Sequence, residues 1–159
     1  MDEDPIVEHK TLVIVIKRIA LAVVAGAVAS ACAAASPGPK NWRPIPGATN
    51  AWAAGGGDAA QEYRYESSAF NGGLQDLASQ VTIDALTRHP GAKFQASRPF
   101  GLCPGAAGVA TFQLRDRMTL QEAFSVRGGR AIRIIYVRPA GTAVNPDAQD
   151  AMQRSLCAF

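Results

Sequence analysis

The alternation of apolar and polar residues in the first half of the chain predicts two strands that pair as a hairpin. Ala48 to Ala53 forms the first strand and Gln61 to Glu66 the second, where Tyr63 and Tyr65 alternate with polar neighbours. The Gly55–Asp58 segment between them supplies the turn. We therefore expect an antiparallel pair at the start of the folded domain.

A helical period follows from Leu74 to His89. Asp76 stands early in this segment, Arg88 stands late, and a proline and a glycine follow His89 as a stop signal. The apolar positions that fall on one side of such a helix are Leu74, Leu77, Ala78, Val81 and Ala85. This face is expected to pack on a sheet.

Four further strands are predicted after the helix, and the last three are joined by short turns. They lie near Lys93 to Arg98, Val109 to Arg115, Thr119 to Val126 and Arg130 to Arg138. A two-residue turn at Gly128 and Gly129 fixes the register of the last hairpin. It sets Val126 opposite Ala131, Phe124 opposite Arg133, Glu122 opposite Ile135 and Leu120 opposite Val137. The final strand is apolar on both faces, so both faces should be covered.

Asn145 and Pro146 open a final helix, as N-cap and first helical residue. Its inward positions are predicted to be Ala148, Ala151, Met152 and Ser155. The whole order, strand, strand, helix, four strands, helix, predicts an α+β fold. We expect one domain over 48–159, with an antiparallel sheet of about six strands sandwiched by two helices.

In this arrangement, residues 42 to 158 resemble the PsbP-like fold, which also occurs in small bacterial lipoproteins. The resemblance rests on the element order, the opening segment with Trp42, the helix start at Phe70–Leu74 and the strand end at Tyr136–Pro139. Members of that fold are mostly non-catalytic accessory proteins that bind other proteins. The resemblance thus implies a binding role without naming a partner or a functional residue.

The first 35 residues have the layout of a signal peptide. Lys17 and Arg18 precede an uncharged apolar run that ends in small residues before Cys32. An uncleaved N-terminal anchor is the alternative. The residues before Lys17 are acidic, which does not suit a leader, so we expect translation to begin at Val15. A spacer rich in proline and glycine follows at 36–47.

The segment Ala29–Cys32 resembles a bacterial lipobox, although Ala29 stands where a larger aliphatic residue is usual. We expect lipidation at Cys32, which would anchor the protein in a membrane of the cell envelope, facing the periplasm or the exterior. Cleavage after Ala35 would instead release a soluble secreted protein. The true start of translation and the choice between these two routes stay open.

Removal or acylation of Cys32 leaves Cys103 and Cys157 as an even pair in an oxidising compartment. We predict that they form a disulfide. Two buried free thiols are the alternative.

The charge balance is mildly basic, with 16 Lys and Arg against 13 Asp and Glu. The arginines are spread along the chain among acids, without the concentrated stripe of a nucleic-acid-binding protein, so we expect no nucleic-acid partner. Four arginines at predicted turns form a candidate surface for anionic lipid or cell-wall polymer: Arg115, Arg117, Arg127 and Arg130. Glu122 and Arg133 become diagonal neighbours in the predicted register and are expected to form a structural ion pair.

No motif in the sequence points to catalysis. His89 is the one histidine of the domain expected over 48–159, and it stands at a helix end, where a cation suits the helix dipole. We therefore assign no catalytic, metal or cofactor-binding residue and expect no enzyme and no cofactor. The leading interpretation is an exported, lipid-anchored accessory protein that binds an envelope protein or other envelope ligand. The alternatives are a small secreted hydrolase and an arginine-mediated adhesive module.

Overall fold

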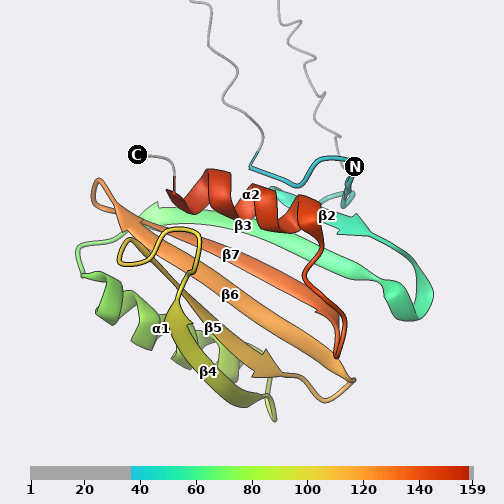
Figure 1. Ribbon diagram of the computed structural model, residues 1–159. Helices are drawn as coiled ribbons and strands as arrows, with labels where there is room; N and C mark the ends of the chain where they lie inside the picture. Colours follow the sequence, from blue (N-terminus) through green and yellow to red (C-terminus); the bar gives the residue numbers. More distant parts are fainter. Residues whose placement is uncertain (1–36, 158–159) are drawn as a thin grey trace, which may run out of the picture. The chain divides into compact units, whose positions relative to one another are not determined.

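The computed structural model describes residues 37–157, which belong to one compact unit. The expectations for the leader, for a start at Val15, for lipidation at Cys32 and for cleavage after Ala35 all concern residues outside this range. The described residues form one antiparallel sheet of seven strands with a helix on each face (Figure 1). This is the predicted α+β architecture.

The strands lie in the order β1-β2-β3-β7-β6-β5-β4 across the sheet. In chain order the elements are β1 Arg43–Pro44, β2 Ala51–Ala54, the short 3-10 helix η1 Gly57–Ala59, β3 Gln61–Ala69, α1 Leu74–Arg88, β4 Lys93–Pro99, β5 Ala107–Gln113, β6 Met118–Arg127, β7 Arg130–Pro139 and α2 Pro146–Cys157. β1 is the strand beyond the expected six. It pairs with β2, and it lies within the range expected to be a spacer.

The register of the β6–β7 hairpin is the predicted one. Val126 pairs with Ala131, Phe124 with Arg133, Glu122 with Ile135 and Leu120 with Val137. Both glycines of the turn, Gly128 and Gly129, have positive φ, as a two-residue primed turn requires. Local turn chemistry therefore sets which side chains of β6 and β7 share a face.

One face of the sheet packs against α2. The buried residues of α2 are Ala148, Ala151, Met152 and Leu156. Leu156 is fully buried where Ser155 was predicted to face inward, and Ser155 is only partly buried. The Ser155 side chain lies beside the hydroxyl of the buried Tyr63, so the predicted inward face of α2 is confirmed, and Leu156 extends it. Trp42 completes this core and contacts the ring of Tyr63 at 6.4 Å between ring centroids.

The opposite face packs against α1. Leu77, Val81 and Ala85 are buried against β5 and β6, as the helical period predicted. Gly73 begins the helix, and its backbone N–H donates a hydrogen bond of 2.8 Å to the Asp76 carboxylate. α1 leaves β3 uncovered on this side, where that strand presents the alternating polar residues Glu62, Arg64, Glu66 and Ser68.

Candidate functional site

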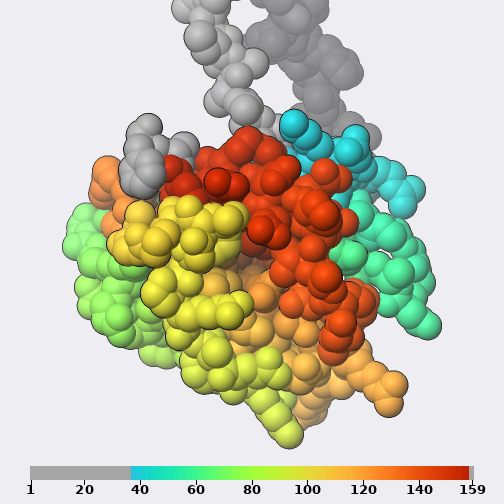
Figure 2. Space-filling view, viewed as in Figure 1, coloured from blue at the N-terminus to red at the C-terminus, as the bar shows by residue number. Residues whose placement is uncertain are grey.

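A hollow opens on the α2 side of the sheet, between α2 and the segment that follows β4. We call it the α2 groove. Its volume is about 390 Å³. It is lined by Arg98, Pro99, Phe100, Gly101, Leu102, Val109, Gln121, Val144, Gln149 and Met152. Figure 2 looks onto this face, where the yellow segment after β4 and the red α2 leave a depression above the orange strands.

The floor of the α2 groove comes from β5 and β6, with the edge strand β4 beside them. Strand pairing places Arg98 beside Val109 on β5, and Thr111 beside Gln121 on β6, with all of these side chains on the α2 face. Gln121 is only 9 % exposed. Its side-chain amide makes no hydrogen bond to any of residues 37–157. The Gln121 amide is thus a polar group without a protein partner among these residues, on the floor of the groove, where water or a ligand can reach it.

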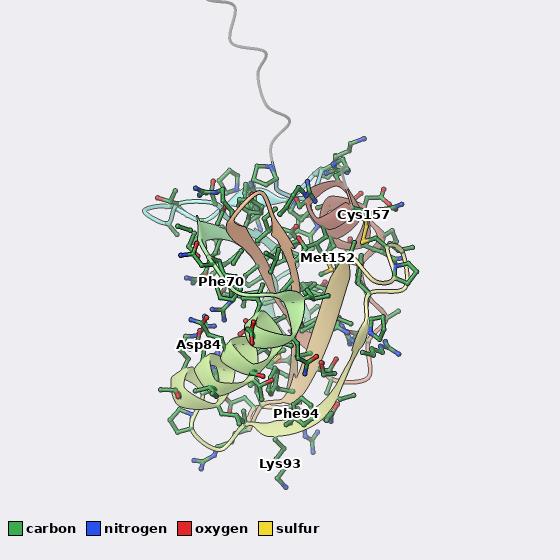
Figure 3. The ribbon with its side chains drawn as sticks, turned by 90° about the vertical axis from the view of Figure 1, so that its left-hand side faces the viewer. Phe70, Asp84, Lys93, Phe94, Met152 and Cys157 are labelled. Atoms are coloured by element: carbon green, nitrogen blue, oxygen red, sulfur yellow. A yellow bond between two sulfur atoms is a disulfide. The ribbon has the colours of Figure 1, made fainter. Side chains whose placement is uncertain are left out.

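The walls of the α2 groove are tied together by a covalent bond. Cys103 and Cys157 form a disulfide with their Cα atoms 5.6 Å apart. Cys103 belongs to the segment after β4 and Cys157 to the last turn of α2, so the bridge joins the two walls; Figure 3 shows Met152 and Cys157 on this side. At the other end of α2, the Asn145 side chain accepts a hydrogen bond of 2.9 Å from the Asp147 N–H as an N-cap.

The electrostatic character of the α2 groove is set by one guanidinium. Arg98 is the one charged side chain among the lining residues, which include no acid. Within residues 37–157, Arg98 makes no ion pair. Two amides, Gln121 and Gln149, and an otherwise apolar surface complete the lining. Such a pocket suits a ligand that is mainly apolar and carries one polar or negatively charged group.

A second polar arrangement lies on the opposite face, beneath α1. Arg133 Nη2 donates to Glu122 Oε2 at 2.7 Å, and Arg133 Nη1 donates to Asp84 Oδ2 at 2.6 Å. Arg88 Nη2 donates to the other Glu122 oxygen at 2.9 Å. Figure 3 shows Asp84 on the side of α1 that bears on this network. Helix α1 and the two central strands are thereby linked by four charges.

The Glu122 carboxyl has no exposed surface. Burial raises its pKa, although the hydrogen bond and charge of Arg133 and the charge of Arg88 act in the opposite direction. For Arg133, burial alone would lower the pKa, but the carboxylates of Glu122 and Asp84 raise it above its usual value. The site is closed by α1 and does not open into the α2 groove. It therefore reads as an ion-pair network that positions α1 on the sheet.

Sequence reasoning missed Asp84 and Arg88 as members of this network. Both follow from the same helical period that gave the apolar face, since Val81, Asp84, Ala85 and Arg88 stand at spacings of three and four along the helix. Gln121 was missed as well. Its signal is the alternation along β6, where Thr119, Gln121, Ala123 and Ser125 share the α2 face.

The structure divides the four turn arginines between opposite ends of β6. Arg115 and Arg117 follow β5 and, with Lys93, line a second pocket of about 390 Å³. Arg127 and Arg130 flank the other turn. Arg127 donates a hydrogen bond of 2.8 Å to the Leu156 carbonyl at the end of α2, and Arg130 donates one of 3.0 Å to Ser67 Oγ. The four arginines therefore do not form one continuous surface.

His89 lies at the C-cap of α1, where its backbone N–H donates to the Ala85 carbonyl at 3.0 Å. It does not line the α2 groove. Among residues 37–157 there is no group of three or more His, Cys, Asp or Glu side chains that would hold a metal ion. In the same range, no helix has the length and apolar character needed to cross a membrane.

Comparisons with known proteins assign no family to this chain. A scan of protein-family models finds no match to the chain, and a search of curated proteins finds none either. Among solved structures, the solution structure of cyanobacterial PsbP from Synechocystis sp. PCC 6803 is similar. The identity is 11 %, the match covers 65 % of this chain and 72 % of that one, and the TM-score is 0.39. A match at this TM-score assigns neither a fold family nor a function to the chain.

Proposed function

We propose that this chain is an exported, non-enzymatic accessory protein of the bacterial cell envelope that binds an envelope ligand in the α2 groove. The observation that carries the proposal is the Gln121 amide, nearly buried and without a hydrogen-bond partner in residues 37–157, on the floor of a mainly apolar hollow. Small-molecule pockets combine such an apolar lining with a few placed polar groups. The groove has this composition.

Two features support export and tethering. The apolar run after Lys17 and Arg18 reads as a leader, and Ala29–Cys32 resembles a lipobox. The Cys103–Cys157 disulfide suits an oxidising compartment, because such bonds are rare in the bacterial cytoplasm. In the proposed protein, lipidated Cys32 is the anchor and the folded domain carries the binding site.

Export is tested by the intact mass of the native protein from separated membrane and soluble fractions, with and without reductant. A membrane species that starts at Cys32, with acyl mass and one disulfide, is the expected result. A soluble species that starts near Ser36 would show that the protein is secreted and not anchored through a lipid. An unprocessed chain with free thiols would overturn export.

The binding role is tested by capture from cross-linked envelopes. Val144 lies at the groove and is only partly buried, so Val144→Trp should fill the hollow without entering the core. We expect this variant to lose the ligand or protein that the native chain captures. Arg64→Gln, an exposed arginine on the opposite face of the sheet, is the matched control and should retain it. Equal capture by the native chain and Val144→Trp would remove the groove from the proposal.

A second candidate function is adhesion to anionic lipid or cell-wall polymer. It is favoured by the three cations that line one pocket at the end of β5 and β6: Lys93, Arg115 and Arg117. Binding of this type weakens steeply as salt rises, because exposed charges are screened over about 10 Å at 0.1 M. Binding to anionic vesicles that is unchanged by salt, or by Arg115→Gln with Arg117→Gln, would exclude it.

A further inference from the structure

We propose that the α2 groove binds a small alkyl carboxylate, with the carboxylate held between Arg98 and Gln121. The proposal rests on the binding function proposed for the groove, and it names the chemical class of the ligand.

Charge is the first argument. Arg98 is the one charged residue of the lining, no acid accompanies it there, and it makes no ion pair within residues 37–157. A guanidinium binds a carboxylate through two parallel N–H donors, so an anion with this planar shape matches it best. A single cation also suits a ligand with one negative charge better than a phosphate monoester with nearly two.

The second argument is the position of Gln121. Arg98 on β4 pairs with Val109 on β5, and Gln121 on β6 pairs with Thr111, two residues along β5 on the same face. Strands β4 and β6 therefore flank β5, about 10 Å apart at a spacing of nearly 5 Å per strand. Arg98 is exposed, and an arginine side chain is long enough to reach across part of this distance. A carboxylate above Val109 then receives hydrogen bonds from the Arg98 guanidinium and from the NH₂ group of Gln121.

The apolar lining defines the rest of the ligand. Six side chains supply it: Pro99, Phe100, Leu102, Val109, Val144 and Met152. Leu102 is 41 % exposed and leaves apolar surface at the groove. Burial of an alkyl chain against these residues would remove apolar surface from water on both sides.

The polar groups of the lining also argue against a peptide. Arg98 and Gln121 are both used by the carboxylate, and only Gln149 remains as a side-chain hydrogen-bonding group. The several backbone amides of a peptide would enter an apolar surface largely without partners, at a cost in affinity. The volume of about 390 Å³ is near the lower end of the range for small-molecule sites. A short alkyl chain fits these limits.

The test is a calorimetric titration of the disulfide-bonded mature protein with octanoate, octan-1-ol and octylammonium. We expect octanoate to bind at least tenfold more tightly than the other two probes, because it alone pairs with Arg98. Arg98→Gln should reduce the octanoate affinity to that of octan-1-ol and leave the octan-1-ol affinity unchanged. Gln121→Leu, which roughly keeps the size of the side chain, should lower the octanoate affinity several-fold. Arg64→Gln, an exposed position on the opposite face of the sheet, should change neither affinity.

Equal affinities for octanoate and octan-1-ol, or full octanoate affinity in Arg98→Gln, would overturn the carboxylate assignment. Tighter binding of N-acetyl-leucyl-leucine than of octanoate would overturn the alkyl assignment. In each case the proposed binding function stands if Val144→Trp still abolishes envelope capture. If no probe binds and Val144→Trp captures as the native chain does, both proposals fail. Thermal melting of each variant confirms that the fold is intact.

Discussion

Arg133 and Glu122 meet beneath α1 with 2.7 Å between Nη2 and Oε2, although they belong to adjacent strands and neither is directly opposite the other. The hairpin register places Arg133 across from Phe124 and Glu122 across from Ile135, so the pair is diagonal. Long side chains bridge such diagonals readily. The Glu122 side chain has no exposed surface and the Arg133 side chain is only 12 % exposed, so each charge is stabilised mainly by the other and little by water.

Replacement of Arg133 by methionine should lower the free energy of unfolding by about 3 to 5 kcal/mol at neutral pH. The variant leaves the buried Glu122 carboxylate with Arg88 alone, and Arg88 is 40 % exposed. Urea denaturation of the native chain and Arg133→Met measures the difference. If the stability were unchanged and octanoate binding were lost instead, the structural role assigned to Arg133 would be wrong.

Asp84→Asn serves as the matched comparison for the same guanidinium. The Asp84 side chain is 35 % exposed, so water replaces much of its interaction with Arg133. We expect a loss below about 1 kcal/mol, as for other partly exposed ion pairs. A loss as large as that of Arg133→Met would show that Asp84, rather than Glu122, is the main partner.

The raised pKa of Glu122 has a direct consequence for stability. In the folded state Glu122 binds its proton more tightly than in the unfolded chain, where a glutamate titrates near about 4.3. Between that value and the folded pKa, the native state holds more protons, so the free energy of unfolding falls as pH rises. The stabilising contribution of protonated Glu122 is complete below the unfolded pKa.

Glu122→Gln removes this titration. The free energy of unfolding of the native chain minus that of Glu122→Gln should therefore decrease as pH rises from about 4, and become constant above the folded pKa. Denaturation of both proteins at a series of pH values measures this difference. A difference that increases with pH over the same interval would mean that the two arginines outweigh burial and lower the pKa.

The disulfide should contribute about 4 kcal/mol in the chain-entropy model, given the sequence separation of 54 between Cys103 and Cys157. Cys103→Ser with Cys157→Ser should lose this amount, and the native chain in reductant should match the double variant. Urea midpoints with and without reductant provide the measurement. If reductant also lowered the urea midpoint of the double variant, the loss of stability would not be due to this disulfide.

Gly108 lies where β5 passes beneath an aromatic ring. A Cβ atom at this residue would approach Phe124 to 2.7 Å, and both residues are buried. Gly108→Ala should therefore lower the free energy of unfolding by about 1 to 3 kcal/mol through overpacking. Gly56→Ala is the control, since a Cβ there meets nothing within 4 Å. Equal melting temperatures for the two variants would contradict this account.

The elements of the fold were predictable because each depends on local signals. The helical period from Leu74 and the glycine turn at 128–129 both act over a few residues, and they fixed α1 and the last hairpin. β1 was missed because Arg43 and Pro44 form a strand only by pairing with β2. Neither residue carries the pattern of a strand.

The site was less predictable than the fold, for a related reason. The α2 groove brings together Arg98, Gln121 and Gln149, which belong to β4, β6 and α2. No spacing in the sequence links them, because the antiparallel order of strands and the return of α2 over the sheet create their proximity. The turn arginines show the opposite case. The sequence suggested one surface for all four, but Arg115 and Arg117 lie before β6 and Arg127 and Arg130 lie at its other end.

The wall that α2 gives to the groove is secured at both ends. At its start, the Asn145 N–H donates to the Tyr136 hydroxyl, which in turn donates to Gln61 Oε1 at 2.6 Å. At its end, the helix is bonded to the segment after β4. A ligand of the proposed kind would thus meet a cleft whose walls are already fixed, and little conformational entropy would be lost on association. The fixed dimensions of the groove should therefore determine which ligand lengths bind, and α2 should not need to move for a ligand to enter.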